Sequence, residues 1–133
     1  KMYKEFDKAP EKMEELAEIF KKTDGFIIVS GEYNHSAPPA LFNLMNHFQK
    51  EYLFKPAGIV SYSAGNFGGV RAAVHLRAFV SELGMPTIST MFPISKVQDL
   101  DKEFYSERIQ RFLNEFEWYV DALKKKREEG TPF

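Results

Sequence analysis

A short, uninterrupted apolar run at residues 26–29 constrains the fold of this chain more than any other feature. Its sequence, Phe-Ile-Ile-Val, is too short for a helix and lacks the alternation of a half-exposed strand. Such runs are typical of parallel strands that helices cover on both faces. A helical pattern at residues 9–22 precedes it, and Asp24-Gly25 separates the two. The run therefore predicts an α/β protein with a parallel sheet.

The remaining elements alternate in the same way. Helical patterns are expected at residues 40–52, 70–83 and 101–129, and strands at residues 58–62 and 87–94. This order implies right-handed βαβ units. Pro93 indicates an edge for the third strand, whereas the apolar first strand is expected to have neighbours on both sides. Three strands do not provide them, so we infer that strands of the sheet are missing from this chain.

Length and composition limit the classes of function. The 133 residues allow one domain, predicted to span 1–133, and a formal net charge of −1 gives no reason to expect nucleic acid or an anionic membrane as partner. No apolar run reaches the length of a membrane span. The absence of cysteine excludes disulfides and thiolate metal sites and fits a cytoplasmic protein. Because the sequence begins with Lys1 rather than methionine, we expect a fragment or a processed product.

Two polar loops follow the first two strands. The first runs from Gly31 through residues 32–36 (Glu-Tyr-Asn-His-Ser), where Ser36 is expected to cap the next helix. The second, residues 63–69 (Ser-Ala-Gly-Asn-Phe-Gly-Gly), is neither a Walker loop nor Gly-x-Gly-x-x-Gly. Its glycines either admit a flat ligand to the backbone or serve a tight turn with positive φ. Because the carboxyl ends of parallel strands share one edge, Tyr33 and Phe67 would flank a planar ring, with Asn34 hydrogen-bonding it. The pair suggests a flavin-like ring better than a phosphate.

Other catalytic motifs are not evident. There is no Gly-x-Ser-x-Gly elbow, and His35, His47 and His75 lie on different predicted elements. A surface or interface role suits the two helical histidines better than a metal or catalytic one. We therefore assign no catalytic side chain and no metal ligand.

Taken together, the Glu-Tyr-Asn loop, the Gly-Gly loop and the following Leu76-Arg77…Leu83-Gly84 resemble the NAD(P)H-dependent FMN reductase family over residues 9–116. This flavodoxin-like group includes quinone, azo-dye and chromate reductases. The resemblance implies FMN as cofactor and NADPH or NADH as co-substrate. Carried over by position, the implied cofactor-binding residues are Gly31, Glu32, Tyr33, Asn34, Ser61, Tyr62, Gly65, Phe67, Gly68 and Gly69.

The chain also departs from the family pattern. Gly31 stands where the family usually has proline, and the Gly-Ser-x-Arg phosphate loop of the first strand is absent. The family's sheet order 2-1-3-4-5 would here lack its first two strands and leave the edge of strand 26–29 open. The helix at residues 40–52 resembles the one at the family's dimer interface, which would account for the apolar Phe42.

The resemblance implies a homodimeric or homotetrameric FMN oxidoreductase of the quinone reductase type. Hydride would pass from NAD(P)H through the flavin to a quinone, flavin, azo compound or metal oxyanion. The alternative is a truncated, non-catalytic flavodoxin-like module that acts through subunit contacts. A separate N-terminal segment is a further expected partner, and FMN binding by this chain alone is expected to be weak.

Overall fold

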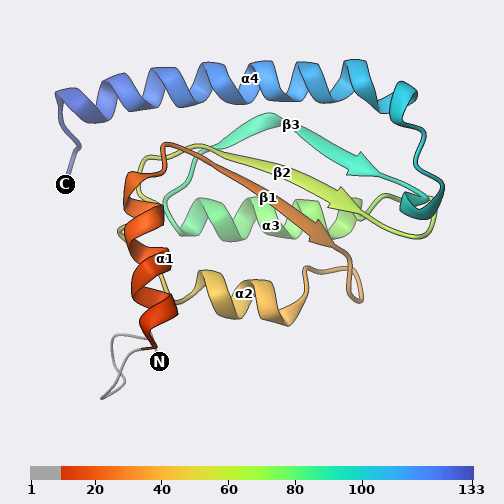
Figure 1. Cartoon of the computed structure of the whole chain (residues 1–133), viewed down its shortest axis with the longest axis horizontal. Coiled ribbons are helices and arrows are strands. Elements are labelled where there is room, and N and C mark those ends of the chain that lie inside the picture. Colours follow the sequence, from red (N-terminus) through yellow and green to blue (C-terminus); the bar gives the residue numbers. More distant parts are fainter. Residues whose placement is uncertain (1–9) are drawn as a thin grey trace.

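A computed structural model describes residues 10–133, which form a three-stranded sheet between layers of helices (Figure 1). In chain order the elements are α1 (Glu11–Lys22), β1 (Phe26–Gly31), α2 (Pro39–Met45), β2 (Ala57–Tyr62), α3 (Val70–Glu82), β3 (Thr87–Ile94), the 3₁₀ turn η2 (Val97–Asp99) and α4 (Lys102–Glu129). The helix start predicted at Ala9 lies outside the described residues. The three predicted strands are confirmed.

All three strands are parallel, in the order β1-β2-β3. β1 pairs in register from Phe26 opposite Ala57 to Gly31 opposite Tyr62. β3 forms the other edge of the described sheet, as Pro93 predicted, and it remains paired at this proline, which lies opposite Ser61. The predicted α/β fold class is therefore confirmed. The order agrees with a 2-1-3-4-5 sheet that lacks its first two strands.

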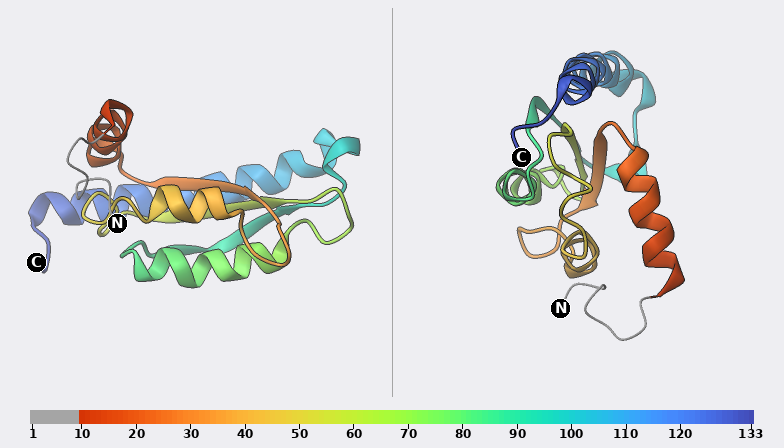
Figure 2. Two further views of the ribbon diagram at one scale, coloured as in Figure 1. Left: turned by 90° about the horizontal axis from the view of Figure 1, so that it is seen from below. Right: turned by 90° about the vertical axis from the view of Figure 1, so that its left-hand side faces the viewer.

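Helices lie on both faces of the sheet, two on one face and one on the other (Figures 1 and 2). α2 and α3 lie on one face and α4 runs along the other, while α1 packs near the end where β1 begins (Figures 1 and 2). On the α2 and α3 side the buried cluster includes Ile28, Met45, Phe48, Ile59, Leu76 and Val80. Under α4 the buried residues are Val60, Ile88, Phe92 and Phe112. Gly58 allows this second packing, because a Cβ there would lie 2.7 Å from the Phe112 ring.

The second helix is shorter than predicted. α2 ends at Met45 rather than near Tyr52, and Pro38 with no side-chain cap precedes it, so the expected capping role of Ser36 is wrong. Phe48 and Tyr52 are nevertheless buried, because their rings pack around Phe20 at centroid distances of 4.8 and 5.8 Å. Tertiary aromatic packing thus replaces the last predicted turns of helix.

Phe42 does not need a second subunit to explain its apolar side chain. Its ring packs edge-on against Phe79 of α3, with 4.8 Å between the centroids, and it joins the main core cluster. The expected dimer interface on this helix stays a prediction.

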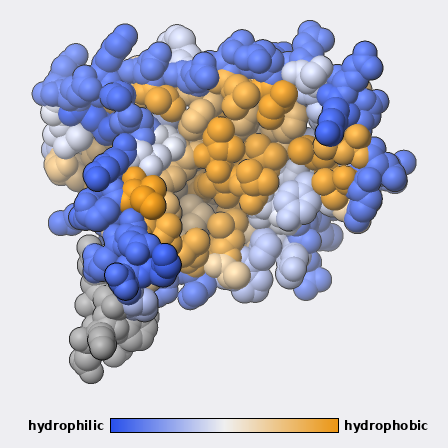
Figure 3. Space-filling view, viewed as in Figure 1, coloured by the Kyte–Doolittle hydropathy of each residue, from blue (hydrophilic) through white to orange (hydrophobic). Residues whose placement is uncertain are grey.

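One face of β1 is open. Ile27 and Val29 are 40% and 61% exposed, because α4 packs over β3 and leaves the outer strand uncovered. Figure 3 shows the resulting apolar surface in the middle of the molecule. The expectation that the run would be covered on both faces is therefore wrong for the described residues, whereas the expected open edge is confirmed.

Among residues 10–133, none of the helices has the length and apolar character that a membrane span requires.

Candidate functional site

The first loop is a tight, two-residue turn at the carboxyl end of β1. Tyr33 and Ser36 exchange both backbone hydrogen bonds, at 2.8 and 3.0 Å. The two residues between them, Asn34 and His35, have φ values of 49° and 65°. Positive φ at both central positions is the pattern of a type I′ turn, which asparagine tolerates well. The turn leaves the Tyr33 ring 63% exposed above the edge of the sheet.

Two serines hold the second loop, at the carboxyl end of β2. The Ser63 hydroxyl accepts a hydrogen bond from the Gly68 amide at 2.9 Å and donates one to the Gly65 carbonyl at 3.1 Å. The buried Ser61 hydroxyl donates to the Gly68 carbonyl at 2.7 Å. Ser61, a predicted cofactor-binding residue, is thus occupied in positioning the loop. Ser63 was not among the predicted site residues, although its place two residues before a glycine indicates such a turn.

The glycines of this loop have different reasons to be glycine. Gly68 and Gly69 have φ values of 63° and 72°, and a Cβ on Gly69 would lie 2.9 Å from the Tyr62 carbonyl oxygen. These two positions fit the tight-turn explanation. Gly65 has no positive φ, and a Cβ there would meet no atom within 4 Å. Only Gly65 leaves bare backbone facing open space, as the approach of a flat ligand requires.

A carboxylate links the first loop to the helix that follows the second loop. Oε2 of Glu32, in the first loop, accepts a hydrogen bond of 3.1 Å from the backbone amide of Ala72 in the first turn of α3. The amides of a first helical turn lack partners within the helix, and the helix dipole favours an anion there. The loops lie side by side because they follow paired strands, and Glu32 fixes the first loop against the start of α3. It also occupies the helix end where a phosphate would otherwise bind.

The two loops expose aromatic rings, with the side chains of His35 and Arg71 beside them. Tyr33 and Phe67 are 63% and 67% exposed, and Tyr62 is 39% exposed beside Gly31. The Arg71 guanidinium lies 5.0 Å from the centre of the Phe67 ring. Within the part of the chain that the structure describes, no cluster of acidic and histidine side chains is arranged to hold a metal. The arrangement suits a planar ring that stacks on aromatic groups and hydrogen-bonds to backbone. The ten predicted contacts to a cofactor themselves stay predictions.

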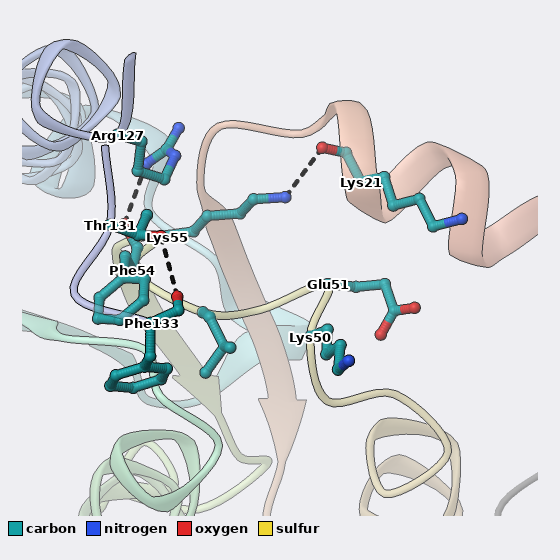
Figure 4. Close-up of a pocket in the computed structure, with 9 residues that line it drawn as sticks. Lys21, Lys50, Glu51, Phe54, Lys55, Arg127, Thr131 and Phe133 are labelled. Atoms are coloured by element: carbon teal, nitrogen blue, oxygen red, sulfur yellow. Dashed lines mark hydrogen bonds between the residues drawn. The ribbon is translucent and has the colours of Figure 1, made fainter. Parts of the chain in front are cut away.

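A cavity of about 660 Å³ lies at the other end of the sheet, before the strands begin (Figure 4). Its basic side chains serve the fold. The Lys55 ammonium donates to the carbonyls of Phe20 and Lys21, at 2.6 and 3.0 Å, and so caps the end of α1. Burial lowers the pKa of Lys55. Arg127 donates to the Phe54 carbonyl and to Asp24. These cations point to different partners rather than to one ligand.

Sequence comparison identifies a family for most of the chain. The model of the NADPH-dependent FMN reductase family matches residues 1–99, which include both loops. A quinone reductase of Escherichia coli (strain K12) is 38% identical over 72 residues, covering 51% of this chain and 38% of that protein. The NADH:(hydroxy)cinnamate reductase subunit CrdA of Vibrio ruber is 28% identical over 140 aligned positions, covering 94% of this chain and 68% of the relative.

The fold has relatives among solved structures. The flavoenzyme NAD(P)H:(acceptor) oxidoreductase FerB of Paracoccus denitrificans superposes with a TM-score of 0.68 at 22% identity, over 88% of this chain and 70% of that one. At this identity the likeness supports the fold alone. The chain spans about two fifths of the length of the quinone reductase it matches.

Proposed function

The chain belongs to the NADPH-dependent FMN reductase family, and we propose that it forms the flavin-ring half of an FMN-dependent oxidoreductase. The observation that carries the proposal is that two loops with exposed rings and bare backbone lie at one edge of the sheet, where Glu32 of the first loop bonds to the start of α3, directly after the second loop. When bound, FMN would supply the redox chemistry, accepting hydride from NAD(P)H and reducing a quinone, free flavin, azo compound or metal oxyanion.

The residues of the site fit the ring of FMN. Tyr33 and Phe67 offer exposed faces for stacking, and Gly65 leaves the backbone accessible. The Asn34 amide, held in the turn, has both a donor and an acceptor for the heteroatoms of a flavin. The proposed work of this chain is to orient the ring and to hold hydrogen-bond donors beside it.

The phosphate of FMN has no comparable holder in the described residues. Glu32 occupies the first turn of α3, and Asp101 accepts from the Phe104 amide at the start of α4. The remaining helix at this edge, α2, begins with Pro38-Pro39, and proline has no amide hydrogen to donate. We therefore propose that this chain binds the ring and gains little from the phosphate.

Flavin titration tests the ring-only site. If the site recognises the ring alone, riboflavin and FMN should quench with dissociation constants that agree within about threefold, a difference below ~1 kcal/mol. Submicromolar binding of FMN with much weaker binding of riboflavin would show a phosphate site and refute this. NADPH oxidation by the purified assembly in the presence of added FMN distinguishes the enzyme from the alternative, a non-catalytic module that acts through subunit contacts.

We also propose that the intact protein covers the open edge of β1 with a further parallel strand. The Phe26 amide donates toward β2, so the alternating backbone groups of Ile27 and Val29 point away from it. The same two side chains are exposed on the uncovered face. A separate N-terminal segment would supply this strand, and homodimer or homotetramer formation is proposed in addition. Native mass spectrometry of the purified assembly reports whether a second polypeptide is present.

The cytoplasmic location expected from the sequence stays a prediction.

A further inference from the structure

A second hollow adjoins the glycine loop on the side away from the first loop. It has a volume of about 390 Å³ and lies where three segments meet. The second loop contributes Phe67 and Gly68, the end of β3 contributes Pro93 and Ser95, and α4 contributes an aromatic pair and an arginine. Ligands of open α/β sheets collect at this edge, outside the carboxyl ends of the strands.

The arginine at this hollow is exposed and lies beside two aromatic rings. The guanidinium of Arg108 lies 5.5 Å from the Phe104 ring centre and 5.8 Å from that of Tyr105. It also lines a neighbouring hollow of about 330 Å³ beside Arg111. Rings at such distances attract a cation and reduce its freedom, so less entropy is lost when it binds a ligand.

Arg108 differs from Arg77 and Arg127, whose charges are used by the fold. Arg77 donates to the carbonyls of Ile88 and Ser89, and Arg127 pairs with Asp24 at 2.8 Å. No carboxylate within residues 10–133 lies at ion-pair distance from Arg108. A guanidinium offers five donors in a planar fork that matches a carboxylate or a phosphate.

We propose that this hollow binds a planar organic anion, with its carboxylate or phosphate on Arg108 and its ring against Pro93. The inference rests on the proposed function, because the second loop would border both this hollow and the flavin ring. The two natural sources of such an anion are the phosphate of a nicotinamide nucleotide and the carboxylate of an aromatic electron acceptor. Both require the same recognition, a cation beside an aromatic wall.

Nuclear magnetic resonance of the ¹⁵N-labelled full chain tests the site without flavin. Benzoate and benzamide share a ring and differ in charge, so their affinity ratio isolates the contribution of the cation. We expect benzoate to bind roughly tenfold more tightly, as for one charge-assisted hydrogen bond, and to shift the amides of Gly68 and Ser95. The Arg108→Gln variant should abolish the preference for benzoate. The matched Arg111→Gln variant, one turn further along α4, should keep it.

Equal binding of benzoate and benzamide by the unaltered chain, or equal loss in both variants, would overturn the proposal. Unfolding midpoints of the two variants show whether loss of binding reflects loss of folding. Adenosine 2′,5′-bisphosphate distinguishes the sources: tighter binding than benzoate indicates a nucleotide phosphate, and weaker binding indicates a carboxylate acceptor. The arms separate the two proposals. A chain that prefers benzoate but does not bind riboflavin refutes the proposed function alone, and the reverse result refutes only this site.

Discussion

Replacing Gly65 or Gly69 by alanine separates ligand approach from folding within one loop. At Gly69 the φ of 72° costs an alanine ~1–2 kcal/mol, because its Cβ approaches the carbonyl oxygen in this conformation. The added Cβ would also lie 2.9 Å from the Tyr62 carbonyl oxygen, a backbone atom that moves only with the strand. Overpacking of this kind costs a further ~1–3 kcal/mol. Gly69→Ala should therefore destabilise the chain by about 2–5 kcal/mol.

Gly65→Ala should have the opposite profile. Its Cβ meets no atom of the chain within 4 Å, so the free energy of unfolding should change by less than about 0.5 kcal/mol. If the backbone at Gly65 faces a flavin ring, the same methyl group obstructs the ring. A steric cost of ~1–3 kcal/mol raises the dissociation constant for riboflavin roughly 5- to 150-fold.

Urea unfolding followed by circular dichroism gives the stability of both variants, and riboflavin fluorescence titration gives binding. The unaltered chain is the reference in both assays. An unchanged riboflavin affinity in Gly65→Ala would remove this residue from the ligand site. Unaltered stability in Gly69→Ala would show that the strain argument is wrong.

Three further predictions concern other parts of the molecule. Glu32→Ala removes the acceptor of the Ala72 amide, so it should cost ~1 kcal/mol in urea unfolding and weaken riboflavin binding by loosening the loops. An unchanged affinity would show that the tie is not needed. The hydrogen bond from Lys124 holds the pKa of Asp24 below its usual value of 3.8, so its stabilisation is complete above that pH and is lost as the pH falls further. Asp24→Asn should flatten the acid limb of the stability–pH curve, by under ~1 kcal/mol because the pair is partly exposed; an identical acid limb would contradict this. Val29→Lys, at a side chain that is 61% exposed, should leave unfolding unchanged but reduce concentration-dependent self-association in sedimentation velocity, as expected of a charge on an open strand edge. Unaltered self-association would locate the contact elsewhere.

The strands were predictable because local chemistry determines them. The run at residues 26–29 is too short and too apolar for another element, and β3 matches its predicted bounds of residues 87–94. Helices were less predictable in their extent. Phe48 and Tyr52 continue the helical spacing of α2, yet their rings pack around Phe20, about thirty residues earlier. Periodicity within a window contains no information on such contacts.

The buried face of α3 shows a second limit. Helical spacing predicts one face from Val70, Ala73, Val74, Arg77 and Val80. Ala73 and Val80 are buried as predicted, whereas Val70 and Val74 are 39% and 50% exposed. The helix packs through Ala72 and Leu76 in their place. Small residues allow a helix backbone to lie close to the sheet. A face with small residues can therefore be buried in preference to a more hydrophobic face. Hydrophobicity summed by residue does not measure that closeness.

The candidate site was also predictable only in part. Sequence alone indicated which residue types gather at the carboxyl edge, since the positions after adjacent parallel strands fix that. It did not distinguish residues that face a ligand from residues that build the surface. Glu32 and Ser61 form hydrogen bonds to the protein itself, and Gly69 is required by its own φ. By contrast, the fold does not require glycine at position 65, because a Cβ there would meet no atom within 4 Å. A position whose chemistry the fold leaves unexplained is the stronger candidate for a ligand contact, and among the loop glycines only Gly65 meets that criterion.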